Sequence, residues 1–250
     1  MIAGRTPQLG AWVKLAAAES VELLALAGFD FVVIDTEHAS IDVRTVSTMV
    51  ATARGCGIDP FVRVPGMAPR DVQVPLDAGA RGLFVPQVED AAAARTAVRS
   101  TRFPPLGQRG ASNTGRAGRW GLDDLADYVA AGNDDTLLVV QVESMRALES
   151  IADIGCVPGV DAIFVGPADL AVSSRRTLAD PDVAALLETA ERSCLTQGVP
   201  LGTTASRDAP DLLTRGYNFL VLGSDTAFLR SAGASLVSGA RVPVRGSDRA

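Results

Sequence analysis

Short apolar runs alternate along the whole chain with longer segments in which apolar positions recur at helical spacing. An apolar run of about four to eight residues predicts a strand buried on both faces, whereas an apolar position every three or four residues predicts an amphipathic helix. Strands are predicted at residues 9–13, 31–34, 60–64, 82–86, 137–142, 162–165, 200–203 and 219–222. Helices are predicted at residues 17–27, 41–54, 72–78, 91–99, 123–130, 145–154, 181–197, 209–215 and 226–237.

Eight strands, each followed by a helix, are the pattern of a (β/α)₈ TIM barrel. The alternative is an open doubly wound sheet, which should carry a glycine-rich dinucleotide loop after its first strand. Residues 10–14, Gly-Ala-Trp-Val-Lys, contain no such loop. We therefore expect one barrel domain over residues 1–250, with a loose polar tail from about residue 239. A long connection rich in Pro, Gly and Arg interrupts the pattern at residues 102–135, and connections of this length are typically functional or mobile.

The composition narrows the class of protein. Apolar residues make up 47% of the chain and aromatic residues only 5%, so Ala, Val and Leu are expected to pack the core. A net charge of −6 argues against nucleic acid or an anionic membrane as a partner. Cys56, Cys156 and Cys194 are odd in number and show no metal-ligand spacing, which suits a reducing compartment. Without a signal segment or a membrane-length apolar run, a cytoplasmic protein is expected.

Polar side chains gather where the predicted strands end, and in a (β/α)₈ barrel the carboxyl ends of the strands carry the active site. The second strand runs directly into Asp35, Glu37 and His38, which is the only histidine in the chain. The other strand ends contribute Trp12, Arg63, Gln141, Glu143, Gly166, Pro167, Ala168 and Asp169.

Each of these residues also has a structural interpretation. Asp35 and Glu37 could cap the helix predicted at residue 41, and Glu143 and Asp169 could cap the helices that follow them. Arg63 could be a structural partner of one acid, and a lone histidine is often an ordinary half-buried side chain. Convergence from five strands favours a site, because buried charges cost several kcal/mol unless they are paired or bound to metal.

The residue types at these strand ends indicate a particular chemistry. Glu143 and Asp169 are hard oxygen ligands that suit Mg²⁺ or Mn²⁺ completed by water and substrate oxygens. An arginine beside such a metal stabilises an enolate or a carboxylate. A histidine oriented by an acid is a general base. Together, Arg63, His38 and the acid pair indicate enolate chemistry on an α-keto acid.

Seven segments, in order along the chain, resemble the HpcH/HpaI family of class II pyruvate aldolases, which belongs to the phosphoenolpyruvate/pyruvate type of TIM barrel. The resemblance extends from about residue 10 to about residue 229. It implies reversible cleavage of a 2-keto-4-hydroxy acid to pyruvate and an aldehyde, through a pyruvate enolate held at a divalent metal (Mg²⁺ or Mn²⁺, with Co²⁺ as a third option). The segments are residues 28–39, 62–65, 76–79, 85–88, 102–110, 141–143 and 165–170.

The resemblance also implies roles for the site residues. Glu143 and Asp169 would hold the metal with Gln141 beside it, and Arg63 would bind the keto oxygen of pyruvate. His38, paired with Asp35, would move protons to and from the enolate and the aldol hydroxyl.

Further roles implied by the resemblance concern the carboxylate and the assembly. Backbone N–H groups near Ala168 and Asp169, with Gly166 and Pro167, would take the pyruvate carboxylate, and Trp12 would line the substrate site. Asp77 would reach the site of a neighbouring subunit, because family members are hexamers built as trimers of dimers with exchanged C-terminal helices. Residues 102–120 would lie near the site entrance.

Some features depart from the family pattern. The loop at residues 170–178 is shorter, should lie over the mouth, and carries Arg175 and Arg176, which could favour an acidic substrate tail or form a surface pair. Pro75 falls near the beginning of the third predicted helix. A Schiff-base aldolase would need Lys14, the only lysine. Two further functions stay open, namely oxaloacetate decarboxylation through the same enolate and keto-acid binding by a barrel without catalysis.

Overall fold

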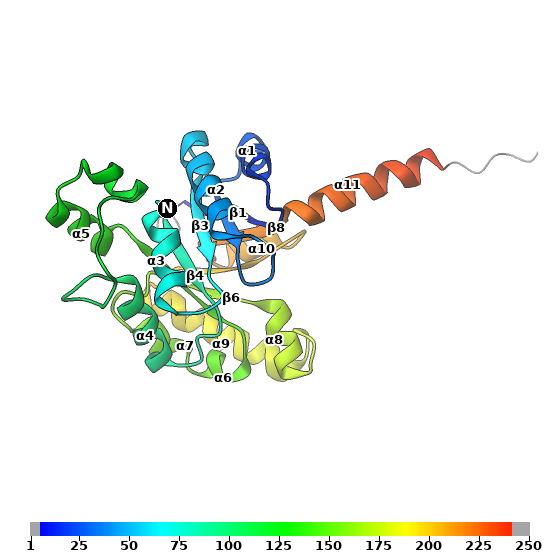
Figure 1. The fold of residues 1–250 in the computed structure, drawn as a ribbon. Coiled ribbons are helices and arrows are strands. Elements are labelled where there is room, and N and C mark those ends of the chain that lie inside the picture. The colour runs from blue at the N-terminus through cyan, green and yellow to red at the C-terminus, as the bar shows by residue number, and fades with distance from the viewer. Residues whose placement is uncertain (1–5, 242–250) are drawn as a thin grey trace, which may run out of the picture.

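The computed structural model describes residues 6–241, in which eight parallel strands close into a barrel in chain order, β1 to β8. The strands form the inner wall and the helices surround it (Figure 1). The predicted TIM barrel is confirmed. The strands are β1 (Gln8–Val13), β2 (Phe31–Asp35), β3 (Asp59–Arg63), β4 (Gly82–Val85), β5 (Leu137–Val142), β6 (Ala162–Val165), β7 (Leu201–Thr204) and β8 (Phe219–Ser224).

The helices follow the strands in sequence, and most of them cover the outside of the barrel. They are α1 (Ala18–Leu26), α2 (Val43–Cys56), α3 (Pro69–Asp77), α4 (Ala91–Thr101), α5 (Leu125–Asp134), α6 (Met145–Glu149), α7 (Ile151–Gly155), α8 (Pro167–Ser174), α9 (Pro181–Gln197), α10 (Ala209–Thr214) and α11 (Asp225–Ala240), with a 3₁₀ segment η1 (Arg116–Gly121) before α5.

The space inside the barrel is filled by aromatic rings, contrary to the expectation from composition. Neighbouring rings meet mostly edge to face, as in the pair Phe61 and Phe84, whose centroids are 5.6 Å apart. Gly10 has no side chain because a Cβ atom there would lie 2.2 Å from the ring of Phe31. Few aromatic residues suffice because they concentrate in one layer. The rings are those of Trp12, Phe31, Phe61, Phe84, Phe164 and Phe219.

Aliphatic residues pack the space between the barrel and its helices, as the composition predicts. The outward side chains of the strands, such as Ile34 and Val62, contact buried helix residues, such as Met49 and Val72. This shell and the aromatic layer make the strands apolar on both faces, which explains their continuous apolar runs in the sequence.

The helix caps decide several of the structural interpretations. Asp42, not Asp35 or Glu37, caps α2 by accepting the N–H of Thr45. Ser144, not Glu143, caps α6. The capping interpretations of these three acids are therefore wrong, and their carboxylates are available for other contacts.

Three details of the helices differ from the prediction. The additional helix α8 follows β6 directly, because Pro167 fits the first turn of a helix, and eight residues give too short an apolar pattern to detect. Helix α3 begins at Pro69, so Pro75 lies in its second half instead of near its beginning. The segment at 145–154 is divided at Ser150 into α6 and α7. The polar tail expected from about residue 239 lies mostly outside the described residues.

Helix α11 leaves the barrel and projects into solvent (Figure 1). Near its beginning Phe228 stacks on Phe29, with ring centroids 5.8 Å apart. Farther along, Leu236 is 75% exposed and Val237 is 50% exposed. Within residues 6–241, no helix has both the length and the apolar character needed to span a membrane.

Candidate active site

A cavity of about 410 Å³ opens at the carboxyl ends of the strands and gathers most of the predicted site residues. Every side chain or loop residue predicted for the site lines this cavity, except Asp35, which lies behind it, Glu37, which lines a neighbouring cavity, and Asp77, which lies elsewhere. The lining residues are Trp12, Lys14, His38, Arg63, Gln141, Glu143, Phe164, Gly166, Pro167, Ala168, Asp169 and Thr204.

Asp35 is fully buried and organises one half of the mouth. The register of the sheet aligns Asp35 with Arg63 on the neighbouring strand. Arg63 therefore donates Nε to Oδ1 at 3.0 Å and Nη2 to Oδ2 at 2.7 Å, and Lys14 Nζ donates to Oδ2 at 2.5 Å. Burial opposes ionisation of Asp35, but these hydrogen bonds together outweigh it and hold its pKa at about 2.

His38 does not pair with Asp35 through its imidazole, which corrects the expectation. Asp35 Oδ1 accepts the backbone N–H groups of Glu37 and His38, both at 3.1 Å, and its remaining capacity is taken by Arg63 and Lys14. The imidazole Nε2 instead lies 3.6 Å from Glu37 Oε2, and the side chain is 54% exposed. Glu37, not Asp35, is therefore the acid that the His38 imidazole faces.

Arg63 is held on three sides. Besides Asp35, its Nη1 lies 3.3 Å from Glu37 Oε2. Its guanidinium carbon stands 4.3 Å from the centre of the Trp12 ring, a cation–π contact. The guanidinium is thus fixed at the floor of the cavity, and Trp12 supports it as well as lining the site.

Glu143 lies in the other half of the mouth and is buried with few compensating contacts. Gln141 Nε2 donates to its Oε1 at 2.6 Å, and the backbone N–H of Gln87 donates to its Oε2 at 3.0 Å. Burial raises the pKa of Glu143 to about 7, and the nearby Asp169 and Glu37 carboxylates add to the shift. Burial likewise raises the pKa of Glu37.

Gln87 was not predicted as a site residue. It has a φ of 56°, a left-handed conformation that is unfavourable for a residue with a side chain. This conformation aims its N–H at Glu143. The segment 85–88 is one of the seven that resemble the family, but a backbone N–H leaves no signature in side-chain chemistry, so sequence reasoning missed it.

The acid half fits a hard divalent cation. Its donors are oxygens, and the buried Gln141 Oε1 has no hydrogen-bond partner. A Cβ at Gly166 would lie 2.8 Å from Glu143 Cγ, so the glycine lets the carboxylate pack against the backbone. Among residues 6–241 no group of three or more His, Cys, Asp or Glu side chains could hold a metal alone. Two carboxylates would leave the other positions to water and substrate, as Mg²⁺ and Mn²⁺ prefer.

Helix α8 begins at the same edge of the cavity. Pro167 occupies its first turn, Asp169 follows there, and no side chain caps this end. The first N–H groups of a helix are free to bind an anion when no cap takes them. Farther along, Val172 and Ser173 line a neighbouring cavity, so the segment from residue 170 lies at the mouth as expected.

That neighbouring cavity, of about 350 Å³, shares His38, Glu143 and Asp169 with the first. Glu37 and Glu89 also line it, and no lysine or arginine of the described part of the chain does. Arg176, the expected cation near this loop, instead pairs with Asp180 and Asp182 on the surface. The surface-pair interpretation of Arg176 is therefore correct.

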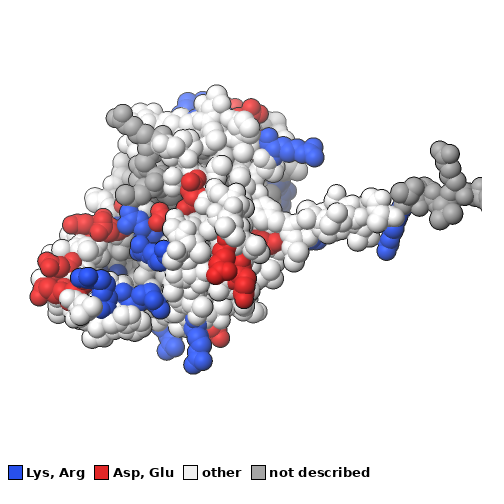
Figure 2. Space-filling view, turned by 90° about the horizontal axis from the view of Figure 1, so that it is seen from above, with Lys and Arg blue, Asp and Glu red and all other residues white. Residues whose placement is uncertain are grey.

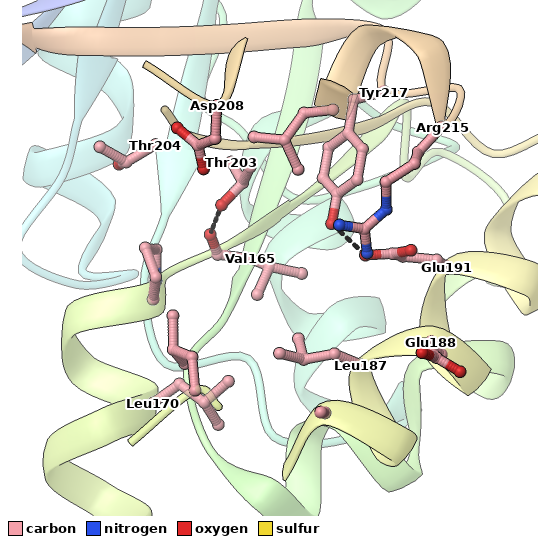
Figure 3. Close-up of a pocket in the computed structure, with 14 residues that line it drawn as sticks. Val165, Leu170, Leu187, Glu188, Glu191, Thr203, Thr204, Asp208, Arg215 and Tyr217 are labelled. Atoms are coloured by element: carbon pink, nitrogen blue, oxygen red, sulfur yellow. Dashed lines mark hydrogen bonds and ion pairs between the residues drawn. The ribbon is translucent and has the colours of Figure 1, made fainter. Parts of the chain in front are cut away.

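A third cavity, of about 320 Å³, lies on the flank between α8, α9 and α10 (Figure 3). Three of its polar groups bind one another, because Tyr217 and Arg215 both donate to Glu191 Oε1, at 2.7 Å and 2.5 Å. Thr203 donates to the carbonyl of Val165 at 2.9 Å. This cavity contains none of the converging acid, arginine and histidine groups of the mouth.

Asp77 lies at the end of α3, away from the cavity of its own chain. Arg109 Nη2 donates to its Oδ1 at 2.7 Å, and the Tyr128 hydroxyl donates to the same oxygen at 3.1 Å. Within one chain, Asp77 is thus not brought together with the other predicted site residues.

The fold and the mouth define a (β/α)₈ barrel with an acid pair, an arginine and a histidine around one cavity. The model of the HpcH/HpaI aldolase/citrate lyase family matches residues 8–232, and the chain belongs to this family.

Relatives that match most of the chain include named aldolases. The chain is 40% identical over 225 residues to a hydroxypyruvate/pyruvate aldolase of Roseovarius nubinhibens, covering 88% of this chain and 87% of the relative. It is 37% identical over 235 residues to a 5-keto-4-deoxy-D-glucarate aldolase of Escherichia coli, covering 92% of this chain and 91% of the relative. The crystal structure of an HpcH/HpaI aldolase/citrate lyase family protein from Burkholderia cenocepacia superposes with a TM-score of 0.88 at 35% identity, covering 96% of both chains.

Proposed function

We propose that the protein is a divalent-metal-dependent aldolase that reversibly cleaves a 2-keto-4-hydroxy acid into pyruvate and an aldehyde. The observation that carries the proposal is the placement of Arg63, His38, Glu143 and Asp169 around one cavity. The names of the aldolase relatives support the substrate class. The negative charge of Glu143 is opposed nearby only by Arg63. A divalent cation bound between Glu143 and Asp169 would neutralise the acid pair.

Residues of the chain bind the substrate and transfer its protons. The N–H groups at the start of α8 bind the keto acid carboxylate, and Arg63 donates to the keto oxygen. His38 takes the proton of the C4 hydroxyl as the C3–C4 bond breaks, which releases the aldehyde and leaves the pyruvate enolate. Protonation at C3 then gives pyruvate. A divalent metal held by Glu143 and Asp169 would supply Lewis-acid stabilisation of negative charge on the keto acid oxygens.

Lys14 offers little support for Schiff-base chemistry. A Schiff-base lysine attacks the carbonyl with a free amine, whereas Lys14 Nζ is held against the Asp35 carboxylate at 2.5 Å. Borohydride reduction in the presence of pyruvate separates the two mechanisms, since only the Schiff-base mechanism leaves a covalent adduct on Lys14.

The test of the proposal needs no knowledge of the aldehyde. Exchange of the pyruvate methyl protons in D₂O, followed by NMR, reports enolate formation directly. We expect exchange with Mg²⁺ or Mn²⁺, none with excess EDTA, and a large loss in His38→Ala. Exchange that persists after complete removal of metal would contradict the metal-dependent mechanism.

We also propose that a second copy of this chain covers α11. The helix projects from the barrel and presents Leu229, Leu236 and Val237 to solvent, and its surface is largely uncharged (Figure 2). Nothing within residues 6–241 covers these side chains, and exposed apolar faces mark interaction surfaces. Such an assembly, extended to the hexamer that the family resemblance implies, would also allow Asp77 to face a neighbouring site.

Light scattering of the purified protein tests the assembly. A multiple of the chain mass is expected for the wild type, and Leu236→Asp should shift it toward a smaller species. Leu195→Asp, at a residue 50% exposed on α9, is the matched control and should leave the mass unchanged. A monomeric wild type would contradict the proposal.

A further inference from the structure

Lys14 is the only lysine among the 23 basic residues, and the proposed mechanism gives it no role. It follows β1 directly, and its side chain lines the cavity at the mouth. The side chain is 30% exposed, so the ammonium is neither buried as a purely structural group nor free on the surface.

The base of the Lys14 side chain is held in place. Asp225 at the start of α11 accepts the backbone N–H of Lys14 and that of Leu15, both at 3.0 Å. Asp225 is itself only 8% exposed. The side chain therefore starts from a fixed point of the backbone, and a pre-positioned group loses less entropy when it binds a ligand.

The ammonium of Lys14 keeps capacity for a ligand. An ammonium has three N–H donors, and Asp35 Oδ2 takes one of them. Within residues 6–241, no other acceptor lies within hydrogen-bond distance of Nζ. Asp35 is also already bound by both Nε and Nη2 of Arg63, so one carboxylate is shared by two cations.

The barrel places Lys14 opposite the acid pair. The strands close in chain order from β1 to β8, so the end of β1 faces the end of β5 across the mouth. Lys14 follows β1 and Glu143 follows β5, and both line the same cavity. Lys14 and Arg63 bind the same oxygen of Asp35. A substrate whose carboxylate binds at the start of α8 and whose keto oxygen binds Arg63 therefore brings the next few atoms of its chain toward Lys14.

The neighbouring cavity is unsuited to an anionic group. Among residues 6–241, its walls carry Glu37 and Glu89 besides the shared acids, and no lysine or arginine. Of the two cavities that flank Glu143 and Asp169, only the first offers cations, namely Lys14 and Arg63. Repulsion by the acids and attraction by Lys14 favour the same orientation of a charged substrate.

We propose that Lys14 is a specificity-determining residue that binds an anionic group, such as a carboxylate, on the aldehyde portion of the substrate. The preferred substrate is then a 2-keto-4-hydroxy acid with a second anionic group at its far end, and the aldehyde product is an oxo acid. This inference rests on the proposed function, because Arg63 and the start of α8 bind the keto acid end of the substrate there.

Matched acceptors test this inference in the intact enzyme. With pyruvate and Mn²⁺, each ω-oxo acid of two to five carbons is compared with its primary amide of the same length, and kcat/KM is measured in the condensation direction. We expect the wild type to prefer the acid of at least one length. Lys14→Met should lose about 10- to 100-fold on that acid and little on its amide, the size expected for a charge-assisted hydrogen bond. Lys14→Arg should recover part of the preference.

Two controls separate the local contact from other effects. Arg176→Met removes one positive charge near the mouth whose partners, Asp180 and Asp182, lie on the surface, and it should leave the acid-to-amide ratio unchanged. Detectable pyruvate methyl exchange in Lys14→Met shows that the variant is folded and that the keto acid half still works, and the acid-to-amide ratio cancels any loss of activity that the two acceptors share.

The outcomes distinguish this inference from the proposed function. An equal acid-to-amide ratio in the wild type and Lys14→Met, with methyl exchange intact, overturns the role of Lys14 and leaves the aldolase proposal standing. If the wild type shows no exchange, the aldolase proposal fails, and calorimetric titration of a 2-keto diacid and its ω-amide still tests Lys14. Equal affinities of these two ligands for the wild type overturn the inference, whereas a diacid preference lost in Lys14→Met supports it.

Discussion

The two halves of the mouth treat a buried carboxylate in opposite ways. Asp35 receives hydrogen bonds from Arg63, Lys14 and two backbone N–H groups, and its pKa is held at about 2. Glu143 is also buried, but it faces other acids, and its pKa is raised to about 7. Burial disfavours the charge in both places, so the neighbours decide the result. The carboxylate of the Asp35 half is paired with cations of the protein, whereas the Glu143 half lacks positive charge.

Removal of the Asp35 charge should have the largest effect on stability. Asp35→Asn leaves the Arg63 guanidinium, only 7% exposed, without its main partner. We expect the free energy of unfolding to fall by about 3–5 kcal/mol, as is common when one member of a buried ion pair is removed. Urea denaturation measures the change.

The control for Asp35→Asn is an exposed ion pair. Arg146 is 69% exposed and pairs with Asp90, so Arg146→Ala should cost less than about 1 kcal/mol. Similar losses in the two variants would show that Asp35 is not the centre of a buried scaffold.

A pH series sharpens the contrast at Glu143. Its folded-state pKa of about 7 lies above the ordinary value of 4.5, so between these values the folded protein binds more protons than the unfolded chain. Glu143 therefore stabilises metal-free protein below about pH 4.5, and this contribution is lost as the pH rises through about 7. The contribution of Asp35 to the stability has the opposite pH dependence, since it is present above pH 3.8 and is lost as the pH falls toward about 2.

Glu143→Gln isolates this effect. In EDTA, the free energy of unfolding of the wild type relative to Glu143→Gln should decrease by about 1–3 kcal/mol between pH 5 and pH 8, given about 1.4 kcal/mol for each unit of pKa shift. Urea denaturation at both pH values measures it. A relative stability that is constant or rises with pH would contradict the assignment of the raised pKa to Glu143.

The smallest expected effect concerns the backbone that holds Glu143. Gln87→Gly keeps the N–H that donates to Glu143 and relieves the left-handed strain at a φ of 56°. Relief of the backbone strain stabilises the folded state, and the greater conformational freedom of glycine in the unfolded chain offsets most of this gain. We therefore expect the free energy of unfolding to rise by no more than about 1 kcal/mol. Gln87→Ala, which keeps the N–H and the strain, is the control. A marked loss of stability in Gln87→Gly would show that the side chain, not the backbone, matters.

The sequence contained most of the fold and the identities of most side chains in the cavity. Strands buried on both faces appear as apolar runs, and the carboxyl ends of parallel strands must share one face of a barrel, so Arg63, Glu143 and Asp169 could be placed together in advance. The aromatic filling of the barrel was missed, because composition does not say where eight phenylalanines gather.

Contacts that depend on rotamers and register could not be predicted. Asp35 and Arg63 pair because the strand register sets them side by side, and this pairing leaves Glu37 to contact His38. From the sequence, Lys14 was considered only as a Schiff-base nucleophile. Its contact with Asp35 and its place across the mouth from Glu143 depend on the closed barrel, which brings distant strands together.

Titration of Mn²⁺ into metal-free protein by calorimetry at pH 6, 7 and 8 tests the contrast between the two halves most directly. If the Glu143 half is an incomplete cation site, Glu143 must lose its proton when the metal binds, and affinity should rise up to about tenfold per pH unit below pH 7 before it levels off. Glu143→Gln should bind far more weakly at every pH. Affinity that does not change with pH, or that survives in Glu143→Gln, would contradict the account.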